Sequence, residues 1–190
     1  MSTLYSIGQM NQLGDAFETA GFTADDVTKL RSFAELASLK GVVRGLAKIV
    51  VVKHVIDCDA DPFLPEGWKV ESHKKGGSLE WDPTKVRLHL SPNQQNGKCI
   101  VGNKLRKELE SEPVFNANVL DFLLKHPELI LEEWKGKYVY FWGTIFRDSD
   151  GYLHVRYLSW LDGRWDWFFH WLGDAWYDIG PAACSQVSSD

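Results

Sequence analysis

Apolar residues in the first 48 positions recur every three or four residues, which is the spacing of one face of a helix. They are Met10, Leu13 and Phe17, followed by Val27, Leu30 and Leu36. Between the two groups, Thr23 stands three residues before Asp26, a pattern typical of a capped helix start. Gly41 favours a break near residue 40. The pattern predicts a helical layer over residues 1–48 that covers a sheet.

From Ile49 onward the pattern changes to short segments typical of strands. Ile49–Ile56 is rich in valine and isoleucine and predicts a strand. Trp68–His73 and Ser78–Asp82 flank a Lys-Lys-Gly-Gly segment, which predicts a hairpin because glycine adopts positive φ at little cost. Lys85–Leu90 alternates apolar and polar residues, as a half-exposed strand does. Residues 49–100 are therefore expected to be β-rich.

Helical patterns return over residues 101–136 and give way to a meander over residues 137–182. Helices are expected at about 103–111, at 117–125 after an Asn116 cap, and at 127–133 after Pro127. Strands are expected at Tyr138–Phe146, Tyr152–Trp160 and Trp165–Leu172, because both intervening segments contain Asp-Gly.

The predicted fold class is α+β. An N-terminal helical layer is followed by a mixed or antiparallel β region and a three-stranded antiparallel aromatic meander. We expect one domain over residues 1–184 and a disordered tail over residues 185–190.

Strand parity divides the meander into two faces. A two-residue turn at Asp162-Gly163 pairs Trp160 with Trp165, and an even-length first loop fixes the first strand as well. The face that includes Val139 and Arg156 is otherwise almost wholly apolar and is expected to be buried. Arg156 then needs a carboxylate partner or a neighbouring tryptophan or phenylalanine ring, because an unpaired buried charge is very costly.

The opposite face mixes aromatic rings with polar side chains. Tyrosine and tryptophan combine a large apolar area with a polar group, a composition found at recognition surfaces. The candidate partner-binding residues on this face are Tyr138, Tyr140, Trp142, Tyr157, Phe168 and His170. If helices cover this face too, these rings belong to the core. An odd-length first loop would move the first three to the other side.

Charge is distributed unevenly along the chain. The net charge of −5 argues against a dedicated nucleic-acid binder, because such proteins neutralise phosphates. Residues 69–107 nevertheless carry nine basic and three acidic side chains, and residues 108–136 carry an acidic excess. The two segments either neutralise each other or the first one binds phosphate or another anion. The candidate anion-binding residues are Lys74, Lys75, Lys104, Arg106 and Lys107.

Three carboxylates follow the first predicted strand, at Asp57, Asp59 and Asp61. Alternate residues of an extended chain share a face, so these side chains could bind Mg²⁺ or Ca²⁺ through oxygen. The spacing of an EF-hand is absent, because Pro62 stands where that loop needs glycine. Turn and capping roles are the favoured explanation of the three residues. A divalent cation is the only cofactor that the sequence suggests.

Catalytic and targeting motifs are absent from the sequence. It contains no P-loop, no dinucleotide-binding glycine fingerprint and no Gly-x-Ser-x-Gly segment. The three cysteines lack metal or redox spacing, which suits a reducing compartment. There is no signal-peptide pattern and no apolar run long enough to span a membrane. We therefore expect a cytoplasmic protein without a membrane segment, and the sequence names no enzymatic activity.

Several stretches resemble a group of small bacterial proteins without an established function. They are Asp57–Phe63, Gly67–Glu71, Gly102–Leu109, Asn116–Asp121 and Trp142–Ile145. The resemblance covers about residues 48–182. It implies one evolving unit and a bacterial cytoplasmic setting, and it implies no activity, cofactor or partner.

Three hypotheses of function follow from these features. The first is a non-enzymatic module whose aromatic face binds a protein partner. The second is a protein that binds nucleic acid or a phosphate ligand through residues 69–107. The third is a cation-dependent enzyme with its site at Asp57, Asp59 and Asp61.

Overall fold

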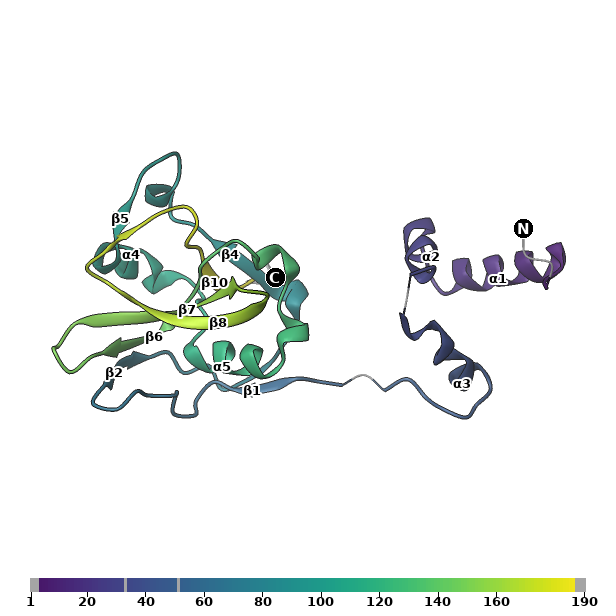
Figure 1. Ribbon diagram of the computed structural model, residues 1–190, viewed down its shortest axis with the longest axis horizontal. Coiled ribbons are helices and arrows are strands. Elements are labelled where there is room, and N and C mark those ends of the chain that lie inside the picture. Colours follow the sequence, from purple (N-terminus) through teal and green to yellow (C-terminus); the bar gives the residue numbers. More distant parts are fainter. Residues whose placement is uncertain (1–3, 33, 51, 187–190) are drawn as a thin grey trace. The chain divides into compact units, whose positions relative to one another are not determined.

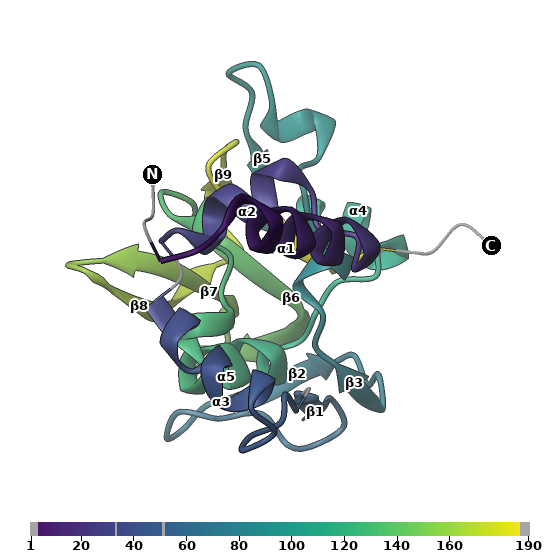
Figure 2. The ribbon, with the colours of Figure 1, turned by 90° about the vertical axis from the view of Figure 1, so that its right-hand side faces the viewer.

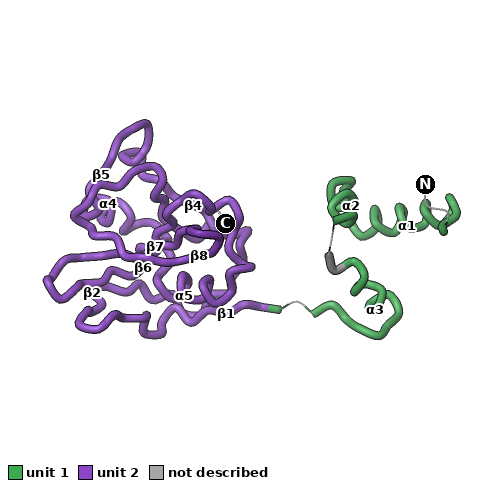
Figure 3. Tube along the Cα trace, viewed as in Figure 1, with its two compact units in different colours: residues 1–52 green, residues 53–190 purple. Residues whose placement is uncertain are grey.

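Helices come first along the chain, and a mixed sheet with shorter helices follows (Figure 1). The computed structural model describes residues 4–32, 34–50 and 52–186. These residues form two units, 1–52 and 53–190 (Figure 3), and each is described by itself. The predicted α+β fold class is confirmed. The expectation that residues 1–184 form one domain, with the first helices covering the sheet, stays a prediction.

The first unit consists of short capped helices. Helix α1 (Ile7–Thr19) begins at Ser6, whose hydroxyl accepts a hydrogen bond from the Gln9 backbone N–H. Helix α2 (Ala24–Leu30) begins with the predicted capping box of Thr23 and Asp26. A 3₁₀ turn at Ala34–Ala37 and helix α3 (Leu39–Val43) follow, so the first helical break comes earlier than residue 40. None of the described side chains in α1, α2 and α3 is buried.

A mixed sheet of six strands organises the second unit. Its strands are β2 (Lys69–His73), β4 (Val86–His89), β6 (Val139–Arg147), β7 (Leu153–Leu161), β8 (Arg164–Trp171) and β10 (Ala182–Ser185). The order is β4-β10-β6-β7-β8, and β2 pairs with the second half of β6. Only the β10–β6 pair is parallel among the described strands of this sheet. Two small ribbons pair β1 (Val55–Asp57) with β3 (Ser78–Glu80) and β5 (Ile100–Val101) with β9 (Ala175–Trp176).

Each face of this sheet is covered by a different helix. Helix α5 (Ala117–Lys125) begins at the predicted cap Asn116 and packs Val119, Leu120 and Leu123 against one face. Helix α4 (Gly102–Glu108) continues as a 3₁₀ turn, Leu109–Ser111, and packs Leu105 and Leu109 against the other. Figures 1 and 2 show both helices and the adjacent strands β6 and β7. The sheet is therefore enclosed on both sides.

The three strands of the predicted meander are present as β6, β7 and β8. Trp160 pairs with Trp165 as the two-residue turn requires. The first loop, however, has five residues, Asp148–Tyr152, and is therefore odd. A bulge in β6 compensates, since Tyr140 pairs with Tyr157 whereas Ile145 pairs with Val155, leaving three extra residues on β6. The odd loop and the odd number of extra residues in the bulge cancel, so Tyr140 lies on the predicted face. Ile145, which lies beyond the bulge, is predicted on the opposite face but lies on the same face as Tyr140.

Two strand predictions and one helix prediction are wrong. Strand β1 begins only at Val55, because its partner β3 has three residues. Ile49, Val50, Val52 and Lys53 are exposed, and Val51 lies outside the described residues. Strands β2 and β3 do not form a hairpin, since they pair with β6 and β1. The expected helix at 127–133 is two 3₁₀ turns, Pro127–Leu129 and Glu132–Trp134.

The C-terminal segment contributes a strand that the sequence pattern does not predict. Strand β10 lies between β4 and β6, so Ser185 belongs to the sheet and not to the predicted tail. Residues 187–190 of that tail lie outside the described residues. Among the residues that the structure describes, no helix has the length and apolar composition of a membrane span.

Candidate functional site

Four of the six candidate aromatic residues form a network of ring contacts around Tyr157. The Tyr157 ring centroid lies 5.3 Å from that of Tyr138, 4.9 Å from that of Tyr140 and 5.6 Å from that of Phe168. The strand register explains these contacts, because Tyr157 pairs with Tyr140 on one side and with Phe168 on the other. These side chains share a face as predicted, but only because the bulge in β6 offsets the odd length of the first loop.

Tyr140 extends the network to the remaining two candidates. Its ring centroid lies 6.4 Å from that of Trp142 and 5.7 Å from that of His170. The prediction that Tyr140 and Trp142 form an exposed platform is nevertheless wrong, since they are only 2% and 5% exposed. The reason is that Trp176 of β9 packs on both rings, with centroids at 4.1 and 4.7 Å. Exposed rings remain at the other end of the network, where Tyr138 and Phe168 are each 38% exposed.

His170 is bound to the buried part of the network by a hydrogen bond. Its Nδ1 lies 2.6 Å from the Tyr140 hydroxyl. Burial lowers the pKa of His170 and outweighs the opposing effect of Asp174, whose carboxylate is 3.5 Å from Nε2. Burial also raises the pKa of Tyr140 far above its ordinary range. The neutral imidazole therefore accepts a hydrogen bond from the Tyr140 hydroxyl at Nδ1. This bond fixes the buried phenol in place.

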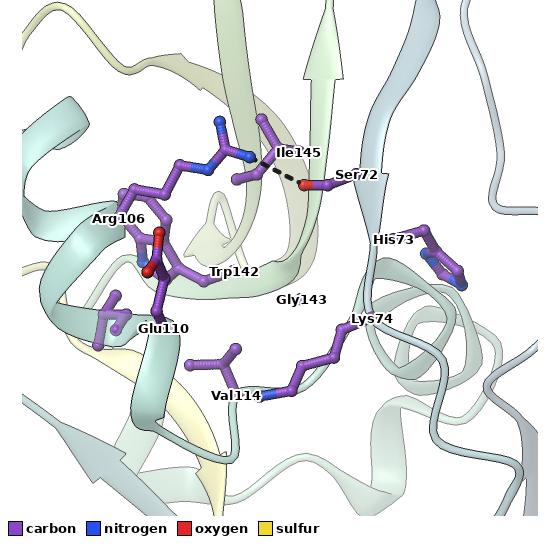
Figure 4. A pocket seen from close by; sticks show the side chains of 10 residues that line it. Ser72, His73, Lys74, Arg106, Glu110, Val114, Trp142, Gly143 and Ile145 are labelled. Atoms are coloured by element: carbon purple, nitrogen blue, oxygen red, sulfur yellow. Dashed lines mark hydrogen bonds between the residues drawn. The ribbon is translucent and has the colours of Figure 1, made fainter.

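Two of the five candidate anion-binding residues, Lys74 and Arg106, line one pocket of about 240 Å³ (Figure 4). Lys75 lies at a neighbouring hollow of about 200 Å³, which Lys74 also lines. Lys104 and Lys107 are exposed on α4 and line neither space. Helix geometry explains this separation, because residues two apart, such as Lys104 and Arg106, point about 200° apart around the axis. We call the first space the Lys74–Arg106 pocket.

Arg106 and Lys74 stand at opposite ends of the Lys74–Arg106 pocket (Figure 4). Arg106 Nη2 donates to Ser72 Oγ at 3.2 Å, and Lys74 Nζ donates to the Glu112 carbonyl at 2.8 Å. Glu110 adds one carboxylate to the lining. The two cations therefore outnumber the acidic groups of the pocket.

The inner wall of the pocket is apolar except for one group. Trp142, Ile145, Leu109 and Val114 line it. The indole N–H of Trp142 is buried and has no hydrogen-bond partner among the described residues. A buried donor without a partner destabilises the fold, because it has lost its hydrogen bonds to water and gained none in return. Because this N–H is itself inaccessible, Trp142 contributes its apolar ring to the pocket wall.

A polar network behind β2 holds the wall of the pocket in place. His73 points away from the pocket (Figure 4), with Nδ1 2.8 Å from Thr144 Oγ1 and Nε2 3.0 Å from the Cys58 carbonyl. Asn116 Nδ2 donates to the Cys58 and Lys74 carbonyls at 2.8 and 3.0 Å. These bonds connect β2, the bulge of β6, the start of α5 and the loop after β1, so the backbone at Lys74 is firmly positioned.

Two of the three aspartates after β1, Asp57 and Asp59, hydrogen-bond to the local backbone. Asp59 Oδ1 accepts hydrogen bonds from the backbone N–H groups of Gly76 and Gly77 at 3.1 and 2.9 Å. Asp57 Oδ1 accepts from the Asp59 N–H at 2.9 Å. Within the described part of the chain, no group of three histidine, cysteine, aspartate or glutamate side chains is arranged to hold a metal ion. The structure therefore supports the turn and capping roles of Asp57 and Asp59 and does not assemble a cation site with Asp61.

Arg156 has both kinds of partner that its burial requires. It is 1% exposed, and its Nη2 donates to Asp121 Oδ1 at 2.8 Å. Its guanidinium carbon lies 4.1 Å from the ring centroid of Trp167. The sequence-based expectation of a carboxylate or a ring is therefore confirmed for this residue.

Glu110 and Ser72 are pocket residues that the sequence analysis missed. Ser72 gives no chemical signal in the sequence. Glu110 does give one, because it follows Arg106 by four residues, the spacing at which helical side chains become neighbours. Treating residues 108–136 as a separate acidic block concealed this relationship.

Comparison of the chain with protein-family models, with curated proteins and with solved structures finds no match. The resemblance to small bacterial proteins stays a prediction. Several of the stretches that carry it do meet in the structure. Asn118 Nδ2 donates to the Asp57 and Ala60 carbonyls at 2.9 and 2.8 Å, and the Ala117 N–H donates to Thr144 Oγ1 at 3.0 Å.

Proposed function

We propose that the protein is a binding module, and not an enzyme, for a small phosphate-bearing ligand held in the Lys74–Arg106 pocket. One observation carries the proposal. Two cationic side chains from separate parts of the basic segment, Lys74 and Arg106, line the same pocket. Both are hydrogen-bond donors, so they favour a ligand rich in acceptor oxygens.

The charges of the pocket favour an anion. Arg106 uses one hydrogen bond on Ser72, and its guanidinium carries five N–H donors, so further donors remain for a ligand. Hydrogen bonds between a guanidinium or ammonium group and a phosphate oxygen are about twice as strong as neutral ones. Glu110 opposes only one of the two positive charges.

The size of the pocket favours a small ligand over a nucleic acid. Its volume of about 240 Å³ lies below the range of roughly 300–1,000 Å³ of sites for drug-sized ligands. A nucleic acid is held by a row of phosphate contacts, whereas Lys104 and Lys107 lie outside the pocket. The apolar wall formed by Ile145, Leu109 and Val114 fits a phosphate that carries a small apolar group.

Phenyl phosphate is a suitable probe, because it combines a phosphate with one small ring. We expect it to bind the intact chain in a calorimetric titration, and more tightly than inorganic phosphate does. Arg106→Gln and Lys74→Gln should each weaken binding about tenfold or more. Lys104→Gln and Lys107→Gln are matched controls, since each removes one positive charge outside the pocket and should leave the affinity unchanged.

Two results would contradict this proposal. One is equal loss of affinity in all four variants, which would mean that net charge and not the pocket binds the probe. The other is tight binding of a single-stranded oligonucleotide, weakened steeply by salt, with no binding of phenyl phosphate. The second result would favour nucleic acid as the partner of the basic segment.

The exposed end of the aromatic network supports a second candidate, the binding of a protein partner. Tyr138 and Phe168 both contact the Tyr157 ring and are each 38% exposed, and tyrosine and phenylalanine are enriched in interfaces. The double variant Tyr138→Ser, Phe168→Ser should abolish capture of a partner from a bacterial lysate. Tyr152→Ser is the control, because Tyr152 is 54% exposed and contacts Trp171 instead. Equal capture by wild type and the double variant would exclude this surface.

A further inference from the structure

A second space lies on the opposite face of the sheet, beside α5. It has a volume of about 500 Å³, and we call it the α5 hollow. Its polar lining comprises Asp61, Asp121, Lys125 and Arg156, and its aromatic lining comprises Phe63 and Trp167. None of these residues lines the Lys74–Arg106 pocket, so the two spaces are separate.

Arg156 is incompletely paired where it lines the α5 hollow. Nη2 donates to Asp121, but Nε and Nη1 are buried and have no hydrogen-bond partner among the residues described. A buried charge with unpaired donors is destabilising, because no water replaces the lost hydration. The same donors become favourable when an acceptor reaches them. The guanidinium is therefore a binding group as well as a structural one.

We propose that the α5 hollow binds a small monocarboxylate with an apolar body. A carboxylate oxygen accepts a charge-assisted hydrogen bond from a guanidinium N–H, and Nε and Nη1 of Arg156 are the nitrogens that lack a partner among the described residues. The Phe63 and Trp167 rings lie edge to face with centroids 5.5 Å apart, and they offer an apolar wall for the rest of the ligand. This proposal is independent of the phosphate-bearing ligand proposed for the other pocket.

The charge balance of the hollow favours a single negative charge. Arg156 and Lys125 are balanced by Asp61 and Asp121, so the lining is neutral overall. A phosphate dianion would meet about twice the repulsion from Asp61 and Asp121 that a carboxylate meets, and a carboxylate still brings one negative charge to the unpaired nitrogens of Arg156. Asp121 also has a second basic neighbour available, because Lys125 stands four residues later on α5, one turn along the helix.

Phe63 is the exposed part of the wall beside the Arg156 guanidinium. Its ring centroid is 5.5 Å from the guanidinium carbon, and it is 51% exposed. It belongs to the irregular segment between β1 and β2, where no strand or helix restrains it. Rotation of this half-exposed ring disturbs little of the core, so entry to the guanidinium has a small cost.

Benzoate is the probe for this proposal, and the indole N–H signal of Trp167 reports its position. We expect benzoate to shift that signal in two-dimensional NMR spectra of the full chain, with the signal assigned through Trp167→Phe. Benzyl alcohol, which has the ring without the charge, should leave the signal in place. Arg156→Lys keeps the charge and loses the planar group, and it should weaken benzoate binding at least about tenfold.

A second variant does not depend on the folding of Arg156→Lys. Asp61 is exposed, and Asp61→Asn removes one repelling carboxylate, so benzoate should bind about two- to fivefold more tightly. Asp178→Asn removes an exposed carboxylate outside the hollow and should change nothing. Arg106→Gln should leave benzoate binding intact, which separates this site from the other pocket. The proposal is overturned if benzoate leaves the Trp167 signal unmoved in wild type and in Asp61→Asn, or if Arg106→Gln abolishes its binding.

Discussion

The two faces of the sheet in the second unit are covered by different helices. On one face, α5 buries Val119, Leu120 and Leu123 completely. On the other face, α4 and the 3₁₀ turn after it pack beside Trp142, and the Lys74–Arg106 pocket and an exposed aromatic end lie there. Strand parity decides which side chains share a face, and the covering elements decide which of those side chains water reaches.

The largest expected effect is on the covered part of the α4 face. Tyr140→Ala should lower the free energy of unfolding by about 3–5 kcal/mol, because it removes a buried ring and leaves His170 Nδ1 without its donor. Urea denaturation monitored by circular dichroism measures this change. Tyr152→Ala is the control at an exposed ring and should cost less than about 1 kcal/mol. Similar values for both variants would show that Tyr140 is not part of a packed core.

A smaller loss is expected where the two covered faces meet, at the bulge of β6. A Cβ atom added at Gly143 would lie 2.8 Å from the backbone nitrogen of Asn116 and 2.9 Å from its Cα. Gly143→Ala should therefore cost about 1–3 kcal/mol of unfolding free energy, because backbone must move. Gly76→Ala is the matched control, since the nearest atom to its added Cβ is at an ordinary 3.6 Å. An unchanged stability for Gly143→Ala would mean that the start of α5 does not press on the bulge.

Some of this arrangement could be predicted from the sequence because it depends on local patterns. The Thr23 and Asn116 caps, the register through Asp162-Gly163 and the need of Arg156 for a partner are each determined within a few residues or by one general cost. The exposure of Tyr140 and Trp142 could not be predicted in this way. It depends on Trp176, which reaches both rings from a two-residue strand far along the chain.

Two features of the chain concealed the rest of the site. Strand β10 is made of Ala182, Ala183, Cys184 and Ser185, and it gives no alternating signal because it is buried on both faces. The bulge of β6 is also silent, since Gly143 and Thr144 fit a regular strand equally well. Pocket residues contributed by α4, β2 and the bulge come together only through these long-range pairings.

The free energy of unfolding should depend weakly on pH because of His170, which lies half-buried on the α4 face. Burial lowers the pKa of His170 below its ordinary value of 6.5, whereas Asp174 raises it and His154 lowers it further. The unfolded chain therefore binds a proton at higher pH than the folded protein, so stability is constant above about 6.5 and falls as the pH falls below it. His170→Gln should flatten this fall between pH 7.5 and 5.5 in urea titrations. The carboxylates with lowered pKa values, such as Glu112 and Asp148, lose their stabilising charge only at lower pH.

Leu161→Ala is the control for this titration, because Leu161 is an exposed side chain of β7 without a titratable group. It should leave the slope between pH 7.5 and 5.5 as it is in the wild type. An unchanged slope in His170→Gln would instead mean that His170 titrates alike in the folded and unfolded chains.

The smallest effect is expected at the exposed end of the aromatic network. Tyr138→Ala and Phe168→Ala should each change the free energy of unfolding by less than about 1 kcal/mol, because more than a third of each side chain is already in water. Thermal and urea denaturation measure both changes. A loss above about 2 kcal/mol in either variant would place that ring in the core and remove the surface proposed for a protein partner. Small losses would instead mean that these two rings contribute little to the fold, which leaves them available to a partner.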